Sequence, residues 1–350
     1  MIQICHLGID SFFSPVSLLR VFPYAYLNNV QVVSGGKLSQ IYKEKGHVVG
    51  FKFEANYEAI KKSNIVFVQR SFLQQSTIKI LDDIIKFKKK IIYDTDDLLV
   101  KLPQESESPW SEIHINSEKY FKDFLPLINV FTTTNNYLAN QLKKTFNYNN
   151  IETVPNLILS NFFKKIKKNN SNQDFLKILI GGRQKISETS LIIGVLIKIL
   201  KEHKNVLIFF TGFNKKIPEL ENEKRVFFSG PKAYPEYLKN IDHIRPDMAI
   251  SPLRDTLFNN CKSNIKFLEY SYLNIPGIYS AVYPYINSVD PGMTGILCGT
   301  NDDWYEKIHQ LITDHDLRSN ISKNAYNVVR KNYLVENNIN IFKNICNNLI

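Results

Sequence analysis

The segment CKSNIKFLEYSYLNIPGIYS, residues 261–280, gathers charged side chains that could bind an anion and a sugar. Lys262, Lys266 and Glu269 are spaced i, i+4 and i+7, so they share one face of a helix. The free N–H groups of a helix start, with a lysine beside them, suit a phosphate. A carboxylate about two turns further on can accept hydrogen bonds from sugar hydroxyls. The alternative is a solvated charged face with a weak Lys266–Glu269 pair.

Local signals place both ends of this helix. Ser263 or Asn264 is a suitable N-cap, and Pro276 ends the helix by about Asn274. The strand-like run PGIYS follows at once. The segment therefore predicts a short charged helix that leads directly into a strand.

A second basic group follows another strand-like run in the motif GGRQK, residues 181–185. Gly181 and Gly182 end the run in a turn that permits close approach to the backbone, and Arg183 and Lys185 come next. An arginine at such a turn can bind a diphosphate through two hydrogen bonds. A tight turn with exposed basic side chains is the alternative. No GxGxxG follows the first strand of either half, which disfavours a dinucleotide-dependent oxidoreductase.

Three aspartates follow the strand-like run KIIYD. Asp94, Asp96 and Asp97 could hold Mg²⁺ or Mn²⁺ on a nucleotide, bind sugar hydroxyls, or cap a helix. These three interpretations remain open on the sequence alone. Gly8, in the motif HLGID at the end of the first strand, is a further candidate for the sugar or acceptor side.

The composition describes an ordinary globular chain of 350 residues, 44% hydrophobic and 12% aromatic. We expect no transmembrane helix, because no apolar run reaches about 18 residues, and no signal peptide. The four cysteines are far apart, which indicates a reducing cytosol. The seven histidines form no HxxxH, HxH or HExxH motif, so no histidine metal site is predicted.

The net charge of +11 indicates acidic partners, but no RNA- or DNA-binding signature accompanies it. The run NFFKKIKK, residues 161–168, combines Phe162, Phe163 and Ile166 with four lysines. Such a run suits the interface of an anionic bilayer. A solvated linker is an equally good interpretation.

Apolar strand-like runs alternate with amphipathic stretches in both halves of the chain. The predicted strands are residues 2–8, 30–33, 47–53, 64–69, 90–94, 129–134, 151–154, 175–182, 205–212, 225–230, 247–253, 276–280 and 295–299. A long helix is predicted over 188–203, and the chain ends in helices. Two successive α/β halves predict two doubly wound, Rossmann-like domains that face each other across a cleft, with ligands at the carboxyl ends of the strands.

Several of these motifs together resemble family 4 glycosyltransferases, retaining GT-B-fold enzymes common in bacterial surface-polysaccharide synthesis. The resemblance is carried by SPLRDTLFNNCKSNIKFLEYSYLNIPGIYSAVYPY, GMTGILC and DWYEKIHQLITDHDLRSNISKNAYNVV in the second half. IYDTDDLL and VFTTTNNYLANQL resemble the first domain of a subgroup with an FN..KS.IKFLE motif. It implies an acceptor-side domain over 1–158, a linker over 159–174 and a nucleotide-sugar domain over 175–331. The last helix, 332–350, would pack back on the first domain.

The resemblance also implies roles for single residues. Glu269 would bind the donor ribose, Lys262, Ser263 and Asn264 would touch the donor, and Arg183 would contact its diphosphate. Lys185 would be the partner lysine, and Gly182 and Asn259 would also bind the donor. The chain departs from the family at Cys261, where a first glutamate is expected. Asn259, Asn260 or the Asp94–Asp97 run could substitute for that acid.

We therefore predict a retaining, metal-independent glycosyltransferase with Arg183, Lys262 and Glu269 as its catalytic residues. The expected partners are a nucleotide diphosphate sugar and a glycan or lipid-linked acceptor, with no cofactor and no nucleic acid. The expected location is the cytoplasm, with peripheral attachment to the inner membrane through NFFKKIKK. The alternatives are a non-catalytic sugar-nucleotide-binding protein and a nucleotide-sugar epimerase.

Overall fold

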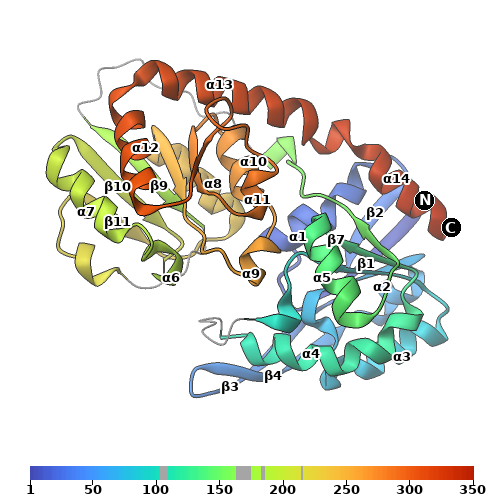
Figure 1. The fold of residues 1–350 in the computed structure, drawn as a ribbon. Helices are drawn as coiled ribbons and strands as arrows, with labels where there is room; N and C mark the ends of the chain where they lie inside the picture. Colours follow the sequence, from blue (N-terminus) through green and yellow to red (C-terminus); the bar gives the residue numbers. More distant parts are fainter. Residues whose placement is uncertain (103–108, 163–174, 183–185, 214–215) are drawn as a thin grey trace. The chain divides into compact units, whose positions relative to one another are not determined.

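The computed structural model describes residues 1–102, 109–162, 175–182, 186–213 and 216–350, which group into two units. Unit 1 comprises Met1–Leu157, Asn260–Ser263 and Val335–Ile350. Unit 2 comprises Ile158–Asn259 and Asn264–Leu334. Each unit contains a parallel sheet of six strands with helices packed against it (Figure 1). Most of the predicted linker, 163–174, lies outside the described residues.

The sheet of unit 1 has the strand order β2-β1-β5-β6-β7-β8, and every pair in it is parallel. Its strands are β1 (Ile2–Gly8), β2 (Val30–Ser34), β5 (Ile65–Gln69), β6 (Lys90–Thr95), β7 (Val130–Thr133) and β8 (Ile151–Thr153). They coincide with the predicted runs to within about one residue at each end. This agreement follows from burial, because a strand covered on both faces is apolar along its whole length.

Helices and short 3₁₀ turns connect these strands. The helices of unit 1 are α1 (Pro15–Arg20), α2 (Tyr57–Lys62), α3 (Ile78–Lys86), α4 (Ser111–Phe124), α5 (Asn136–Phe146) and α14 (Ile339–Leu349). The 3₁₀ turns are η1 (Phe22–Tyr26), η2 (Arg70–Phe72), η3 (Gln75–Thr77), η4 (Leu99–Lys101), η5 (Leu125–Leu127) and η8 (Val335–Asn337). The C-terminal helix α14 packs on η1, where the rings of Phe342 and Tyr24 meet edge to face at 4.9 Å.

The predicted strand 47–53 exists but does not join the parallel sheet, so that placement was wrong. It belongs to an antiparallel hairpin of β3 (Gly36–Glu44) and β4 (His47–Ala55). The connecting residues Lys45 and Gly46 have φ values of 47° and 86°, as a tight hairpin turn requires. The sequence hid the hairpin because β3 is largely exposed and polar, and because Lys-Gly is a weaker turn signal than Asn-Gly.

The sheet of unit 2 has the order β11-β10-β9-β12-β13-β14, also entirely parallel. Its strands are β9 (Leu176–Gly181), β10 (Val206–Thr211), β11 (Val226–Ser229), β12 (Met248–Ser251), β13 (Gly277–Ser280) and β14 (Ile296–Cys298). Numbered along the unit, the order reads 3-2-1-4-5-6, which is the Rossmann arrangement. The two predicted doubly wound domains are thus confirmed.

Helices cover both faces of this second sheet. They are α6 (Ile186–Thr189), α7 (Ile193–Glu202), α8 (Tyr234–Ile244), α9 (Leu257–Asn260), α10 (Ile265–Tyr272), α11 (Tyr283–Ile286), α12 (Asn301–Thr313) and α13 (His315–Asn332), with 3₁₀ turns η6 (Ser160–Phe162) and η7 (Pro218–Leu220). Ile178 and Ile180 of β9 pack with α7 and α12 on one face. Gly181, one residue on, faces the tyrosines of α8 and α10. The predicted single helix 188–203 is broken between α6 and α7.

One buried ion pair ties α1 of unit 1 to its sheet. Arg20 Nη2 lies 2.6 Å from Asp94 Oδ1, and both side chains are at most 1% exposed. Arg20 also donates to the carbonyl of Val154, and Thr132 Oγ1 donates to Asp94 at 2.7 Å. Each charge therefore has its partners inside the protein, which is the condition for burying it.

Replacing Asp94 by Asn should lower the free energy of unfolding by about 3–5 kcal/mol, because it leaves the Arg20 charge buried without a counter-ion. Urea titration followed by circular dichroism measures this. The matched control is Glu58→Gln, which breaks the exposed Glu58–Lys62 pair and should cost less than about 1 kcal/mol. Equal effects of the two substitutions would contradict a structural role for Asp94.

Candidate functional site

The strand order of each sheet fixes where polar side chains converge. In unit 1 the chain leaves β1 toward β2 on one side and leaves β5 toward β6 on the other. In unit 2 it leaves β9 toward β10 on one side and leaves β12 toward β13 on the other. The carboxyl ends of adjacent parallel strands meet at one edge of the sheet, and ligands of doubly wound folds bind at such a switch point. The predicted residues Gly8, Gly182 and the Asp94–Asp97 run all lie at or just beyond these ends.

In unit 2 the centre of the polar group is Glu269 on α10, which is 2% exposed. Its carboxylate accepts from Lys266 Nζ at 2.5 Å, from Tyr234 OH at 2.8 Å and from Tyr237 OH at 3.5 Å. The Lys266–Glu269 pair is therefore buried, and the solvated charged face considered as an alternative is not what forms. The helix runs from Ile265 to Tyr272, and Asn264 precedes it without a capping hydrogen bond.

The electrostatics of this group follow from its burial. Burial alone would lower the pKa of Lys266, but Glu269 and the nearby tyrosines hold it above its ordinary value. Burial and the charge of Glu269 raise the pKa values of Tyr234 and Tyr237 well above their usual range. The tyrosines are thus neutral donors at physiological pH, and the carboxylate faces one ammonium and two hydroxyls.

Gly182 brings the end of β9 against this group. Its φ is +101°, which favours glycine, and a Cβ there would lie 2.6 Å from Lys266 Cε. Tyr270 OH of α10 bonds the backbone N–H of Gly181 at 3.3 Å. Side chains of α10 thus approach the backbone at Gly181–Gly182, and the approach of a ligand there stays a prediction. Arg183 and Lys185 lie outside the described residues.

Glu188 of α6 is a site residue that sequence reasoning missed. Its Oε2 accepts from the backbone N–H of Arg254 at 2.6 Å, and its Oε1 accepts from Asn259 Nδ2 at 3.0 Å. Asn259, a predicted donor-binding residue, is 2% exposed and also donates to the carbonyl of Arg254. The available signal was position, because Glu188 lies in the short helix α6 that follows β9, while the expected long helix made it look like an ordinary helical residue.

In unit 1 the centre is Arg70, directly after β5, which the sequence analysis also missed. Its guanidinium lies 3.3 Å from Asp10, 2.8 Å from Asp96 and 3.0 Å from Asp97. Its φ is +55°, unusual for a residue with a side chain, and Tyr93 OH donates to its carbonyl at 2.7 Å. One cation thus stands among three carboxylates.

Buried polar atoms without a hydrogen-bond partner collect at the same edge. Gln69 Nε2, Arg70 Nε and Asp96 Oδ1 are three of them among the described residues. The last two are an ion pair at 2.8 Å, but their angle does not suit a hydrogen bond. Gln69 Oε1 bonds His6 Nε2 at 3.0 Å, and burial lowers the pKa of His6 to about 4, so its ring is neutral. Gln69 Nε2, which has no hydrogen-bond partner among the described residues, is a donor that a polar ligand would satisfy.

The structure separates the predicted aspartates. Asp94 is 0% exposed and belongs to the Arg20 ion pair, whereas Asp96 and Asp97 face Arg70. Gly8 lies at the end of β1 next to Gln69, where a Cβ would meet the His6 ring at 2.9 Å.

The segment Asn260–Ser263 groups with unit 1, and its predicted donor residues have partners there. Lys262 Nζ lies 3.8 Å from Asp97 Oδ1, and Asn135 Nδ2 donates to the Lys262 carbonyl at 3.1 Å. Ser263 Oγ accepts from Asn156 Nδ2 at 2.9 Å. Asn264, in unit 2, donates to Ser288 Oγ at 2.9 Å.

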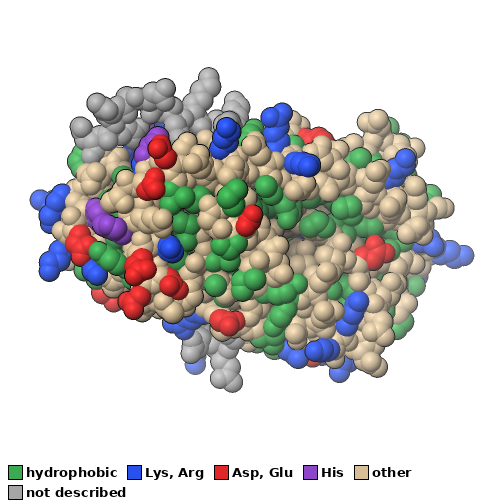
Figure 2. All heavy atoms as spheres, turned by 45° about the horizontal axis from the view of Figure 1, so that its top comes forward, with side chains coloured by type: hydrophobic (Ala, Val, Ile, Leu, Met, Phe, Trp, Pro, Cys, Tyr) green, Lys and Arg blue, Asp and Glu red, His purple; other side chains and the backbone are tan. Residues whose placement is uncertain are grey.

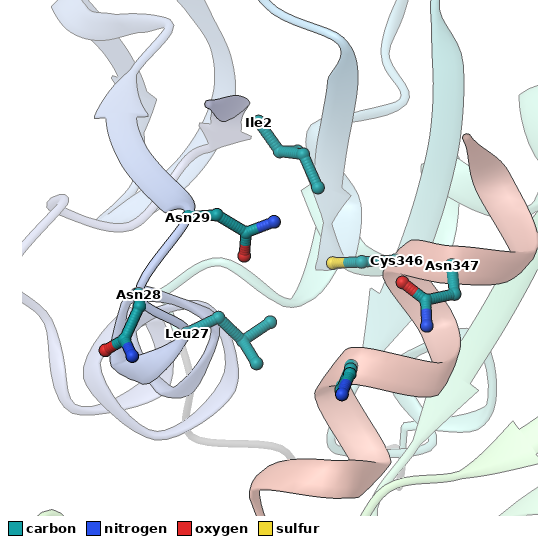
Figure 3. A pocket seen from close by; sticks show the side chains of 7 residues that line it. Ile2, Leu27, Asn28, Asn29, Cys346 and Asn347 are labelled. Atoms are coloured by element: carbon teal, nitrogen blue, oxygen red, sulfur yellow. The ribbon is translucent and has the colours of Figure 1, made fainter.

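A surface pocket of about 220 Å³ lies at the opposite, amino edge of the unit 1 sheet (Figure 3). It is lined by Ile2, Leu27, Asn28, Asn29, Lys343, Cys346 and Asn347. The asparagine side chains that line it are exposed, and the pocket lies far from the carboxyl ends of the strands. We therefore assign it no part in the site.

Two surface properties bear on the predicted partners. On the face drawn in Figure 2, the Lys and Arg side chains of the described residues are scattered, with no single basic patch. None of the described helices is long and apolar enough to cross a membrane. The lysines of NFFKKIKK, Lys164, Lys165, Lys167 and Lys168, lie outside the described residues.

Comparison with known proteins gives structural similarity only. No protein-family model matches the chain, and no curated protein matches it. Sucrose-phosphate synthase from Thermosynechococcus elongatus superposes with a TM-score of 0.71 at 11% identity, over 100% of this chain and 99% of that one. HepE from Anabaena, in complex with UDP and glucose, gives 0.69 at 12% identity over 100% and 99%.

A glycosyltransferase from Rickettsia africae ESF-5 is also similar, with a TM-score of 0.67 at 14% identity, over 99% of this chain and 98% of that one. Identities of this size establish the fold alone. Together with the two parallel sheets and their strand orders, they show that the chain has the GT-B fold.

The burial of Asp96 generates a prediction about pH. Burial raises its pKa from 3.8 to about 6, against the opposing effect of Arg70. The folded state then binds more protons than the unfolded state between about pH 4 and pH 6, so this group's contribution to stability falls as pH rises through that window. Asp96→Asn removes this pH dependence. We expect the free energy of unfolding of the variant, measured relative to the wild type, to be at least about 1 kcal/mol higher at pH 7 than at pH 4.5.

Urea unfolding at both pH values measures this difference. The matched control is Asp123→Asn in α4, an exposed residue of the same unit, whose effect should not change with pH. The opposite result is that Asp96→Asn and the wild type differ in free energy of unfolding by the same amount at pH 4.5 and at pH 7. That result would show that Asp96 is ionised at both pH values and would contradict the prediction.

Proposed function

We propose that the protein is a retaining glycosyltransferase that transfers a sugar from a nucleotide diphosphate sugar. The observation that carries the proposal is the buried Glu269 carboxylate at the carboxyl edge of a Rossmann sheet, in a chain with the GT-B fold. The neighbours in fold support the class, since one of them was solved with UDP and glucose. The motifs of residues 251–329 support the retaining subgroup.

Glu269 would bind the ribose of the donor. A carboxylate has about four acceptor sites, and the short contacts to Lys266 and Tyr234 use two of them. The contact to Tyr237 is 3.5 Å long, so a ribose hydroxyl can take its place at little cost. The start of α10, with Asn264, would face the phosphates.

Transfer would proceed on one face of the sugar. The bond from the anomeric carbon to the phosphate oxygen breaks, and a bond to the acceptor oxygen forms on the same side. The acceptor proton goes to the leaving phosphate, which departs as the nucleoside diphosphate. Arg183, Lys185 and Lys262 would stabilise its growing negative charge, so no metal ion is required.

The acceptor would be a glycan or lipid-linked glycan of a bacterial surface polysaccharide. Asp96 and Asp97, with the unbonded Gln69 Nε2, would bind its hydroxyls. Work on a lipid-linked acceptor requires access to a membrane surface, for which NFFKKIKK is the candidate. The chain would then act in the cytoplasm, attached peripherally to the inner membrane.

Replacing Glu269 by Gln should weaken nucleotide-sugar binding at least about 10-fold, because a hydrogen bond to a charged acceptor contributes about 1.5–3 kcal/mol. A thermal-shift panel of nucleotide sugars first identifies the donor, and titration calorimetry then measures its affinity. The matched control is Glu236→Gln on α8, an exposed glutamate next to the tyrosines, which should bind as the wild type does. Binding by a folded Glu269→Gln protein at wild-type affinity would remove Glu269 from the donor site.

The reaction itself is tested with the identified donor, a panel of saccharide acceptors and excess EDTA. We expect release of the nucleoside diphosphate, and a product whose anomeric configuration by NMR equals that of the donor. Inversion would refute the retaining step, and loss of turnover in EDTA that Mn²⁺ restores would assign the aspartates to a metal. Binding without turnover would identify a non-catalytic binder, and an isomerised donor without acceptor would identify an epimerase.

A further inference from the structure

Two helices of unit 2 bring three potential metal ligands together, away from the strand ends. Glu202 and His203 end α7, and His309 lies on α12. His203 Nε2 is 3.0 Å from His309 Nδ1, and one potential ligand atom from each of the three residues lies within 4.8 Å of the other two. Among the described residues, no other three His, Cys, Asp or Glu side chains meet in this way.

We propose that Glu202, His203 and His309 form a binding site for Zn²⁺ or a similar borderline transition-metal ion. Zinc–nitrogen bonds of about 2.0–2.1 Å in a tetrahedral site place two nitrogens roughly 3.4 Å apart. The observed separation of 3.0 Å needs to open by only a few tenths of an ångström. Two imidazoles and one carboxylate leave a fourth position for water, and imidazole ligands select zinc, nickel or copper over magnesium.

The geometry of the two imidazoles carries the site, since ring nitrogens of His203 and His309 already lie 3.0 Å apart. The four cysteines do not compete for the ion. All are buried, which raises their pKa values to about 11 or 12 and keeps them protonated.

A neighbouring tyrosine holds the carboxylate in place. Tyr305, one turn before His309 on α12, donates its hydroxyl to Glu202 Oε2 at 2.5 Å and stacks on the His309 ring. Lys198 Nζ lies 3.5 Å from the centre of the Tyr305 ring, where the π face attracts its charge. Outer partners of this kind orient a ligand and fix its geometry.

The site would fasten α7 to α12, which pack on the same face of the sheet. Binding of an ion to the folded state alone stabilises that state, so the site would make unit 2 more stable in zinc. The sequence analysis predicted no histidine metal site, because His203 and His309 are 106 positions apart and form no local motif.

The test is calorimetric titration of the untagged, EDTA-treated full chain with Zn²⁺ alone. We expect one equivalent to bind, with affinity lost in His203→Ala and His309→Ala. Tyr305→Phe should bind about 10-fold more weakly, since it frees the carboxylate without removing a ligand. Mg²⁺ at the same concentration should not bind here.

The matched control is His315→Ala, which removes an exposed histidine beside Asp316 that has no second imidazole at hand. It should bind zinc as the wild type does. Melting curves in EDTA establish that each variant is folded. The proposal is overturned if the wild type takes up no zinc, or if both His203→Ala and His309→Ala still bind one equivalent with unchanged affinity.

Discussion

The buried Lys266–Glu269 ion pair sets conditions that its whole surroundings must meet. Two charges removed from water cost several kcal/mol each unless they are paired and hydrogen-bonded. Tyr234 supplies a hydroxyl at 2.8 Å, and the backbone at Gly182 leaves the space that the lysine occupies. The positions of α8, α10 and the end of β9 therefore all depend on one carboxylate. A ligand that forms a hydrogen bond with this carboxylate would affect the contacts of all three elements.

Unit 1 also holds partly buried charges at its strand ends, but there one cation faces several carboxylates. Arg70 is one cation among Asp10, Asp96 and Asp97, and its φ of +55° is a strained conformation that the surrounding contacts must hold. The excess of carboxylate oxygens leaves acceptors for hydroxyl groups, while the guanidinium prevents full mutual repulsion. This edge therefore suits a neutral, hydroxyl-rich ligand better than a phosphate. The two sheets differ in the chemistry they offer, although their topologies are alike.

The fold was largely predictable because strands of a buried parallel sheet have continuous Val- and Ile-rich sequences. The exposed strand β3 and the break between α6 and α7 were missed, since neither has a distinctive periodicity or a strong turn dipeptide. Motifs drew attention to Glu269 and Asn259, which the structure places in buried polar clusters, and their roles stay predictions. No motif pointed to Arg70 or Glu188. Each contacts partners many positions away, and only the sheet topology brings those partners together.

Cys261 stands where the resembled family has an acid, and its chemistry does not replace one. Burial raises the pKa of its thiol to about 12, so it is neutral and a weak hydrogen-bond acceptor. Glu188 brings a carboxylate from α6, the helix that follows β9, to Asn259, two residues before that cysteine in the chain. Neighbouring strand ends converge, so an acceptor can be supplied from a different strand and still serve the same ligand. On the proposed function, an acid at position 261 is then not required, because Glu188 supplies a carboxylate to Asn259.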